Sequence, residues 1–210
     1  MAQLREFKKQ QTRQTIARAA TALFLERGFE RTTIADVAAA AGVSKMTVTN
    51  YFARKEDLFF DQHEEVITGP ARAVAARPVG ASALDAVRRD CLEAVERHDP
   101  LLGWTDPGFT RLVGDSAVLR ARLREMYDHQ EQALSVVLAE AVGDEPGAFE
   151  PRHAAAQLGT VLRLLFDEAQ RGVRRGATEE ELFALLDRNA RAAFTRLEPS
   201  LGGYAVRTAG

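Results

Sequence analysis

The chain has 210 residues, of which 46% are hydrophobic and 28% are charged, as in an ordinary folded soluble protein. This length suffices for one large domain or for a small domain and a medium one. No apolar run approaches the roughly 18–20 residues of a membrane span, and the N-terminus lacks the apolar core of a signal peptide. With Cys91 as the single cysteine, no intramolecular disulfide can form. The composition therefore predicts a cytoplasmic protein with no membrane partner.

Charge is distributed unequally along the chain. The net charge is −2, but residues 1–60 carry 10 Lys and Arg against 6 Asp and Glu, whereas residues 61–210 carry 18 against 24. The first part therefore has a charge of +4 and the remainder a charge of −6. Two interpretations fit this asymmetry: an anionic partner that docks at one end only, or a chance difference between the two parts.

The sequence predicts an all-α fold of about nine helices. Ala, Leu, Arg and Glu dominate, and no alternating apolar run bounded by turn residues indicates a strand. Pro70 falls inside the fourth expected helix and predicts a kink or an early end there. In chain order, the expected helices are 8–27, 33–41, 45–51, 55 into the seventies, 82–97, a short one after 106–107, 116–142, 152–174 and 178–197.

Start and stop signals mark the first three helices. Gly28 can adopt a positive φ and ends the first helix. Thr33 caps the second helix, and Asp36 lies in its first turn beside the positive end of the helix dipole. Gly42 ends this helix, and Ser44 caps the third. The result is a short helix, a glycine-containing turn and a second short helix, which together form a helix-turn-helix.

The second short helix of this motif has an outward face without negative charge. If the helix begins at Ser44, Val48 points inward, and residues 44–52 contain no Asp or Glu. The outward side chains suit the DNA major groove: Lys for guanine or phosphate, Asn for adenine, and Met or a Thr methyl group for the thymine methyl. The N–H groups at the starts of both short helices suit phosphate. The motif therefore predicts sequence-specific binding of double-stranded DNA.

This stretch resembles the TetR family of transcriptional regulators over about residues 12–60, and beyond it only length and helical character agree. The matching residues are Leu23-Phe24, Gly28-Phe29, Thr32-Thr33-Ile34, Gly42-Val43-Ser44, Tyr51-Phe52, Lys55-Glu56 and Leu58. Two departures stand out. Thr49 occupies a position where many members have an aromatic residue, and Ala53-Arg54 replaces a frequent Pro-Ser, so the following helix lacks its usual side-chain cap.

The resemblance implies a DNA contact surface on and beside the second short helix. Base edges are expected to be read by Lys45, Met46, Thr47, Thr49 and Asn50, and phosphates to be bound by Thr33, Ser44, Tyr51 and Lys55. Two positions have alternatives: Tyr51 also fits a core role beside Phe52, and Met46 also fits a cover for the hydrophobic rim. The basic residues of the first helix, Arg13 among them, fit either a phosphate grip or a solvated end.

The resemblance also divides the chain into parts. Residues 1–54 are expected to form the helix-turn-helix DNA-binding domain. Residues 55–198 are expected to form a helical domain for effector binding and dimerisation. The glycine-rich residues 199–210 lack periodicity and are expected to form a disordered tail.

The last two expected helices are the predicted homodimer interface. They carry apolar residues at helical spacing, and two such hairpins could form a four-helix bundle across a two-fold axis. The residues are Leu158, Val161, Leu162, Leu165, Leu182, Leu185, Leu186 and Phe194. The alternative is that these faces only close the chain's own core.

A largely apolar small-molecule effector is expected in the second domain. The residues that could line its cavity are Trp104, Phe109, Leu112, Met126, Tyr127, Gln130 and Phe166. Each of them also fits a plain core position. Cys91 is expected to be a small buried hydrophobe, and the histidines show no metal-site spacing, so neither a metal nor a cofactor is predicted.

These patterns predict a homodimeric repressor that leaves a palindromic operator when its effector binds. The alternative is an architectural or cell-cycle DNA-binding protein of the same fold without an effector. An enzyme is not predicted, because the sequence has no Ser/His/Asp set, no Gly-rich phosphate loop and no metal-ligand spacing.

Overall fold

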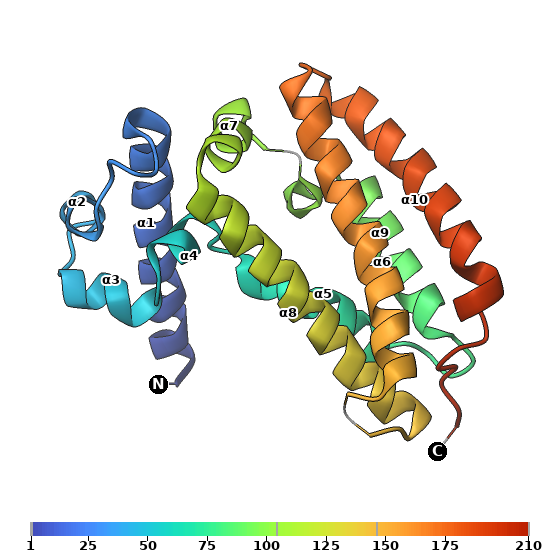
Figure 1. Cartoon of the computed structure of the whole chain (residues 1–210). Helices are drawn as coiled ribbons and strands as arrows, with labels where there is room; N and C mark the ends of the chain where they lie inside the picture. The colour runs from blue at the N-terminus through green and yellow to red at the C-terminus, as the bar shows by residue number, and fades with distance from the viewer. Residues whose placement is uncertain (1, 104, 146, 210) are drawn as a thin grey trace. The chain divides into compact units, whose positions relative to one another are not determined.

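The computed structural model describes residues 2–103, 105–145 and 147–209, and within these ranges the chain is helical and has no strand (Figure 1). The predicted all-α fold is confirmed. The described residues form ten α-helices and one short 3-10 helix, η1. In chain order they are α1 (Ala2–Arg27), α2 (Ile34–Ala40), α3 (Lys45–Tyr51), α4 (Lys55–Phe59), α5 (His63–Ala75), α6 (Ala83–Glu96), η1 (Pro100–Leu102), α7 (Pro107–Asp115), α8 (Ala117–Val142), α9 (Phe149–Arg174) and α10 (Glu179–Leu201).

The helices form two compact units. The first unit contains Met1–His63 and Arg111–Arg122, and the second contains Glu64–Thr110 and Leu123–Gly210. Helix α8 therefore begins in the first unit and continues in the second. The predicted domain boundary after residue 54 falls inside the first unit, because α4 contributes the completely buried Leu58 to that unit.

An aromatic cluster joins α1 and α4 in the first unit. The ring centroid of Phe24 lies 5.1 Å from that of Phe29 and 6.0 Å from that of Phe59. Phe29 and Phe59 meet edge to face at 6.2 Å. Tilted and edge-to-face pairs of this kind are the favoured arrangements of aromatic rings, and all three side chains are buried. The cluster gives the helix-turn-helix a core of its own.

The fourth expected helix is interrupted. Helix α4 ends at Phe59 and α5 begins at His63, where the sequence pattern predicts one helix into the seventies. Phe59 and Phe60 are both buried, and their rings lie 5.0 Å apart. Phe60 leaves the helical conformation, with φ −100° and ψ +59°. The interruption therefore lies at Phe60, and α5 begins three residues later.

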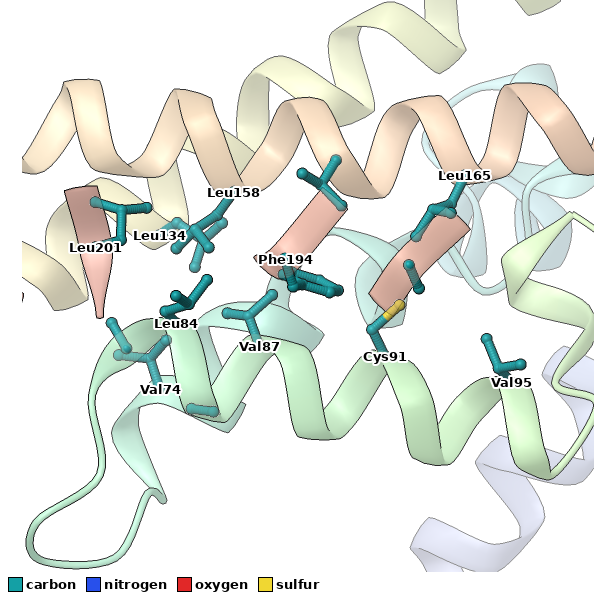
Figure 2. Packing of buried hydrophobic residues seen from close by; sticks show 14 of the residues in the cluster. Val74, Leu84, Val87, Cys91, Val95, Leu134, Leu158, Leu165, Phe194 and Leu201 are labelled. Atoms are coloured by element: carbon teal, nitrogen blue, oxygen red, sulfur yellow. The ribbon is translucent and has the colours of Figure 1, made fainter. Parts of the chain in front are cut away.

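The core of the second unit lies between α6, α9 and α10. Figure 2 shows Val87 and Cys91 of α6 facing Leu158 and Leu165 of α9, with Phe194 of α10 between them. Cys91 is 3% exposed, as expected for a small buried hydrophobe. Burial raises the pKa of its thiol to about 12. The thiol therefore stays protonated and packs as an apolar group.

The apolar faces predicted to form a dimer interface belong to this core. The residues at or below 8% exposure in the single chain are Leu158, Val161, Leu165, Leu182, Leu186 and Phe194, and Leu162 and Leu185 are half-buried. A side chain that its own chain already encloses has almost no surface left to bury against a partner. The interface prediction is therefore wrong for the six buried residues, which close the chain's own core.

The predicted disordered tail is also wrong. Helix α10 continues past Pro199 to Leu201, and the Leu201 side chain is 5% exposed. The residues that follow, 202–209, form what we call the C-terminal strap. Its Ala205 is 7% exposed, so the strap packs against the second unit rather than extending into solvent.

Backbone hydrogen bonds hold the C-terminal strap against the connection between α5 and α6. The Arg207 carbonyl accepts from the Gly80 N–H at 2.9 Å, and the Arg207 N–H donates to the Ala81 carbonyl at 3.0 Å. The buried Arg77 guanidinium donates to the Ala205 carbonyl through Nε at 3.1 Å and Nη2 at 2.8 Å. Hydrogen bonds to a distant loop leave no periodic pattern in the sequence, which explains why the strap was not predicted.

Candidate DNA-binding surface and ligand cavity

Helix α3 has one buried face and one exposed face. Ser44 caps its start, and the Ser44 Oγ accepts a 3.0 Å hydrogen bond from the Thr47 N–H. Val48 is completely buried, as its predicted inward position requires. The turn from α2 passes through Gly42 at φ +67°, a conformation that strains residues with a Cβ. These local features fix which side chains of α3 face outward.

The outward face of α3 carries polar, basic and apolar groups but no carboxylate. Lys45, Met46, Thr49 and Asn50 are exposed, and Met46 has 69% of its surface accessible. Thr47 is half-buried. No Asp or Glu occurs between the first and last residues of the helix. A negatively charged ligand can therefore approach this face without meeting like charge on α3.

The threonine hydroxyls of α3 are engaged within the helix. The Thr49 Oγ1 donates to the carbonyls of Lys45 and Met46, at 3.3 and 3.1 Å. The Thr47 Oγ1 lies 2.8 Å from the Ser44 Oγ. Because the Thr49 hydroxyl turns toward the helix backbone, its methyl group is the part left for an outside contact.

Arg13 of α1 is a structural residue that joins three elements of the first unit. Its guanidinium donates to the Tyr51 carbonyl at 3.0 Å and to the Asp61 carbonyl at 2.8 Å. It also lies 4.4 Å from the centre of the Phe52 ring. These contacts fix the end of α3 relative to α1. They favour a structural role over the phosphate grip that its charge alone suggested.

Thr33 and Asp36 form the capping box expected at the start of α2. The Thr33 N–H donates to the Asp36 carboxylate at 2.8 Å, and the Asp36 N–H donates to the Thr33 Oγ1 at 3.2 Å. The hydrogen bonds from Thr33 lower the pKa of Asp36 below its usual value. The capped turn therefore holds the exposed Thr33 beside the rest of the helix-turn-helix.

Lys55 lies at the start of α4 and is half-buried. Its ammonium group is 4.2 Å from the centre of the Phe29 ring and 3.4 Å from the Glu30 carbonyl. Burial lowers the pKa of Lys55 from its ordinary value. The cation–π contact and the hydrogen bond place the positive charge at the edge of the first unit.

A buried ion pair joins the start of α8 to α4 within the first unit. The Arg122 Nε and Nη2 lie 2.9 and 2.8 Å from one Asp57 carboxylate oxygen, and the two residues are 8% and 5% exposed. The other Asp57 oxygen accepts from the Arg54 N–H at 3.2 Å, which caps α4 in place of a side-chain cap on residue 54. The first turns of α8 are thereby fixed to the helix that follows α3.

The second unit contains a cavity of about 150 Å³. It is formed by side chains from α5, α6, α8, α9 and the segment around η1. Its apolar walls include Cys91, Leu162 and Phe166. Two of its lining residues, Tyr127 and Gln130, each have a buried side-chain oxygen without a hydrogen-bond partner within the described residues.

A proline explains the orientation of Gln130. Pro70 lies inside α5 and has no N–H, so it cannot donate to the carbonyl of Val66 four residues earlier. The Gln130 Nε2 donates to this carbonyl instead, at 2.5 Å. The side-chain amide is therefore fixed with its nitrogen toward α5, and its oxygen is left as an unused acceptor. The expected early end at Pro70 is not found, because α5 continues to Ala75.

A wider groove of about 790 Å³ lies between α8 and α9. Its lining is largely exposed and mixes charged side chains, such as Asp128 and Arg152, with apolar ones, such as Val136 and Phe149. None of the unpaired buried polar atoms in the described ranges belongs to its walls. The smaller cavity is therefore the better candidate for a specific ligand.

Comparison with known families decides the identity of the first unit. Residues 16–61 match the family model of bacterial regulatory proteins of the TetR family, a range that covers the capped helices, the turn and the exposed face of α3. Over residues 16–61, the chain is therefore similar to the TetR family of regulators. It is similar to the HTH-type transcriptional regulator TcmR of Streptomyces glaucescens, with 29% identity over 177 residues that cover 79% of this chain and 76% of TcmR.

Solved structures extend the likeness in fold to most of the chain. NalD of Pseudomonas aeruginosa, the secondary repressor of a multidrug efflux pump, superposes with a TM-score of 0.55 at 22% identity, covering 93% of this chain and 98% of NalD. The transcriptional regulator FadR of Bacillus subtilis, in complex with stearoyl-CoA, gives a TM-score of 0.51 at 18% identity, covering 87% and 97% of the two chains. Within the described ranges, no helix is long and apolar enough to cross a membrane.

The structure places the nine predicted DNA contacts in one unit. Thr33, Ser44, Lys45, Met46, Thr49 and Asn50 are exposed, and Thr47, Tyr51 and Lys55 are half-buried. Because Tyr51 is half-buried, it fits both a DNA contact and a core position beside Phe52. Arg13 was the residue whose structural role the sequence did not indicate, because its partners are backbone carbonyls.

The predicted ligand cavity is only partly assembled. Tyr127, Gln130 and Phe166 line the cavity, whereas Met126 is 2% exposed and is not part of its lining. Phe109 and Leu112 are half-buried, belong to different units and do not line it. Trp104 lies outside the described residues. Helical periodicity alone did not decide which buried side chains border an empty space.

The sequence analysis missed the α5 and α6 walls of the cavity. These walls include Glu65, Val66 and Pro70 on α5 and Asp90 on α6. The one signal for them was Pro70, since a proline inside a helix leaves a carbonyl that needs a donor from another element.

Proposed function

We propose that this chain is a TetR-family repressor that binds a palindromic operator as a homodimer and leaves it when a small molecule occupies the cavity of the second unit. The observation that carries the proposal is the exposed, acid-free face of α3. That face combines a lysine, an asparagine, a methionine and a threonine methyl group, the groups that distinguish base pairs in the major groove.

Base reading is assigned to the outward residues of α3. Asn50 suits a bidentate contact with adenine, and Lys45 suits guanine or a phosphate. Met46 and the methyl group of Thr49 suit the thymine methyl, because the Thr49 hydroxyl is engaged within the helix. Thr47 lies at the margin of this face and is also assigned to base reading.

Phosphate binding is assigned to residues that flank α3. Thr33 and Ser44 are exposed at the starts of the two short helices, Tyr51 lies at the end of α3, and Lys55 lies at the start of α4. Contacts with phosphate fix the register of a protein on DNA but carry no sequence information. These residues are therefore expected to set affinity, and the residues of α3 to set specificity.

The proposed partner is a second copy of the chain, bound through the outward faces of α9 and α10. Leu164 of α9 is 48% exposed although its neighbour Leu165 is in the core. On α10, Ala184 and Ala192 are exposed. Two such helix pairs can form a four-helix bundle about a two-fold axis. A two-fold dimer matches inverted half-sites whose centres are about 34–36 Å apart.

Release by a ligand is assigned to helix α8. Tyr127 and Gln130 of the cavity follow Arg122 on this helix, and Arg122 is paired with Asp57 of α4. A ligand that favours one position of α8 would act on α4 through a continuous helix. It would then depopulate the DNA-binding arrangement in proportion to its differential affinity. The complex of B. subtilis FadR with stearoyl-CoA supports ligand binding within this fold.

The experiment that tests the proposal is selection of bound sequences from random double-stranded DNA at about physiological salt. We expect an inverted repeat with half-sites about one helical turn apart. Salt-sensitive binding without a shared motif would instead support an architectural role. Absence of DNA binding would contradict the proposal.

A further inference from the structure

We propose that the cavity of the second unit takes a compact, ring-sized molecule with a hydroxyl group, such as a phenol or a cyclic alcohol, and discriminates against anionic ligands. This inference rests on the proposed function, in which the cavity is the effector site. It adds the chemical class of the ligand, which follows from the two unpaired polar atoms, the cavity size and the charge of the rim.

The first observation is the fixed orientation of Gln130. Its nitrogen donates to the Val66 carbonyl, which Pro70 leaves without a backbone donor. Turning the amide around would place oxygen against oxygen and lose this bond. The Gln130 Oε1 is therefore an acceptor, is buried, and has no donor within the described residues. A buried acceptor is costly when unpaired, so this atom favours a ligand that donates a hydrogen bond.

The second observation is the Tyr127 hydroxyl. Tyr127 is 8% exposed, and its hydroxyl also has no partner within the described residues. Burial raises the pKa of Tyr127, so the group stays a neutral phenol that can donate and accept. Tyr127 and Gln130 are three residues apart on α8, so they share one face of the helix. A ligand hydroxyl, which both donates and accepts, can serve either group.

Size and wall chemistry restrict the rest of the ligand. The cavity volume of about 150 Å³ is comparable to that of an apolar cavity that holds a single benzene ring. Phe166 meets the ring of Tyr127 edge to face at 6.2 Å, and Leu102 and Leu162 add aliphatic surface. One aromatic or alicyclic ring therefore fits this volume.

The rim of the cavity disfavours anions. Glu65, Asp90 and Asp99 contribute three carboxylates to the lining, of which Glu65 is paired with Arg72, and Arg97 contributes the single guanidinium. Arg97 already lies 3.8 Å from Asp99 and 3.9 Å from Glu93. A carboxylate or phosphate ligand would therefore meet excess negative charge and no free cationic partner among the described lining residues.

Phenol, benzene and benzoate test the proposal, because they share one ring and differ in a single group. We expect the full chain to bind phenol about three- to tenfold more tightly than benzene, measured by titration calorimetry and by the rise in melting temperature. Benzoate is expected to bind more weakly than either. Equal affinity for phenol and benzene, or binding of none of the three, would overturn the proposal and leave ordered water as the occupant.

The matched variant is Tyr127→Phe, which keeps the ring and removes only the hydroxyl. It is expected to bind phenol about three- to tenfold more weakly and to bind benzene as the wild-type protein does. Its melting temperature without ligand is expected not to fall, because the lost group has no partner within the described residues. Unchanged phenol affinity in this variant and in Gln130→Met would overturn the proposal.

DNA binding separates failure of this inference from failure of the proposed function. A protein that binds its selected operator but does not distinguish phenol from benzene would retain the regulatory role and lose the ligand class. A protein that distinguishes the probes but binds no DNA would retain the ligand class and lose the regulatory role.

Discussion

At the scale of single residues, the ion pair between Arg122 and Asp57 is a buried polar contact of the first unit. The two residues are 8% and 5% exposed, and both guanidinium contacts are shorter than 3 Å. Removing one partner from such a pair leaves a buried charge without compensation, which costs more than the intact pair contributes. This asymmetry makes the pair testable by single and double substitution.

Arg122→Met is expected to lower the free energy of unfolding by about 3–5 kcal/mol, because the Asp57 carboxylate stays buried without its partner. Urea denaturation followed by circular dichroism measures this loss. The double variant Asp57→Leu with Arg122→Met is expected to be more stable than the single variant, since no isolated charge remains. A double variant less stable than the single one would show that the two charges do not act as a pair.

Cys91 gives a prediction about pH. Burial holds its thiol at a pKa of about 12, whereas an unfolded cysteine ionises near about 8.5. The thiol therefore contributes stability below the unfolded pKa, and this contribution is lost as pH rises toward the folded pKa. At pH 8.5 we expect iodoacetamide to label the native thiol more than about a hundredfold more slowly than the denatured thiol, as measured by intact mass. Equal rates would mean that the thiol is accessible and ionised.

At the scale of the elements, the C-terminal strap is the segment whose role is most sharply defined. It satisfies the backbone of Gly80 and Ala81 and accepts two hydrogen bonds from the buried Arg77. A chain that stops after Gly202 is expected to lose at least about 2 kcal/mol of stability, because the buried Arg77 guanidinium loses its Ala205 acceptor. Thermal denaturation measures the loss.

The matched control for the strap is a chain that stops after Arg207, which keeps these hydrogen bonds. It is expected to differ from the full chain by less than about 0.5 kcal/mol. Equal stability of the two truncated chains would exclude a stabilising role for the strap.

Helix boundaries with local causes could be predicted from the sequence. The caps at Thr33, Ser44 and Thr178 involve residues within three positions of each other, and all three are present as expected. The break between α4 and α5 could not be predicted, because neither glycine nor proline marks it in residues 55–63.

The two candidate sites also differ in how far the sequence predicts them. The face of α3 could be predicted because burial of Val48 and the helical repeat determine which residues point outward. The ligand cavity could be predicted only in part, since its empty volume depends on how five segments pack. Gln130 illustrates this limit: its role follows from Pro70, a residue on another helix.

At the scale of the whole molecule, the proposed binding to a palindromic operator requires two copies of the chain. The apolar faces of α9 and α10 are buried in the core of the single chain. An interface with a second copy therefore has to form through their outward residues. Leu164→Asp places a charge at the proposed interface, where Leu164 is 48% exposed in the single chain. It is expected to convert a dimer into a monomer in sedimentation experiments, with little change in the fold of each chain.

Val79→Asp is the control for this substitution. Val79 is 62% exposed in the connection between α5 and α6, outside the proposed interface. The control is expected to remain dimeric. Dissociation of both variants, or of neither, would place the interface elsewhere.

The central claim is that the exposed face of α3 reads DNA sequence, and the measurement that tests it most directly is the affinity of Asn50→Ala for the selected operator and its single-base variants. We predict a loss of about 1–3 kcal/mol, with discrimination relaxed at one base pair in each half-site. Lys55→Ala serves as the comparison, and is predicted to weaken binding to all sequences alike and to reduce the salt slope by about one. Unchanged operator affinity in Asn50→Ala, or a loss spread evenly over all sequences, would contradict the claim.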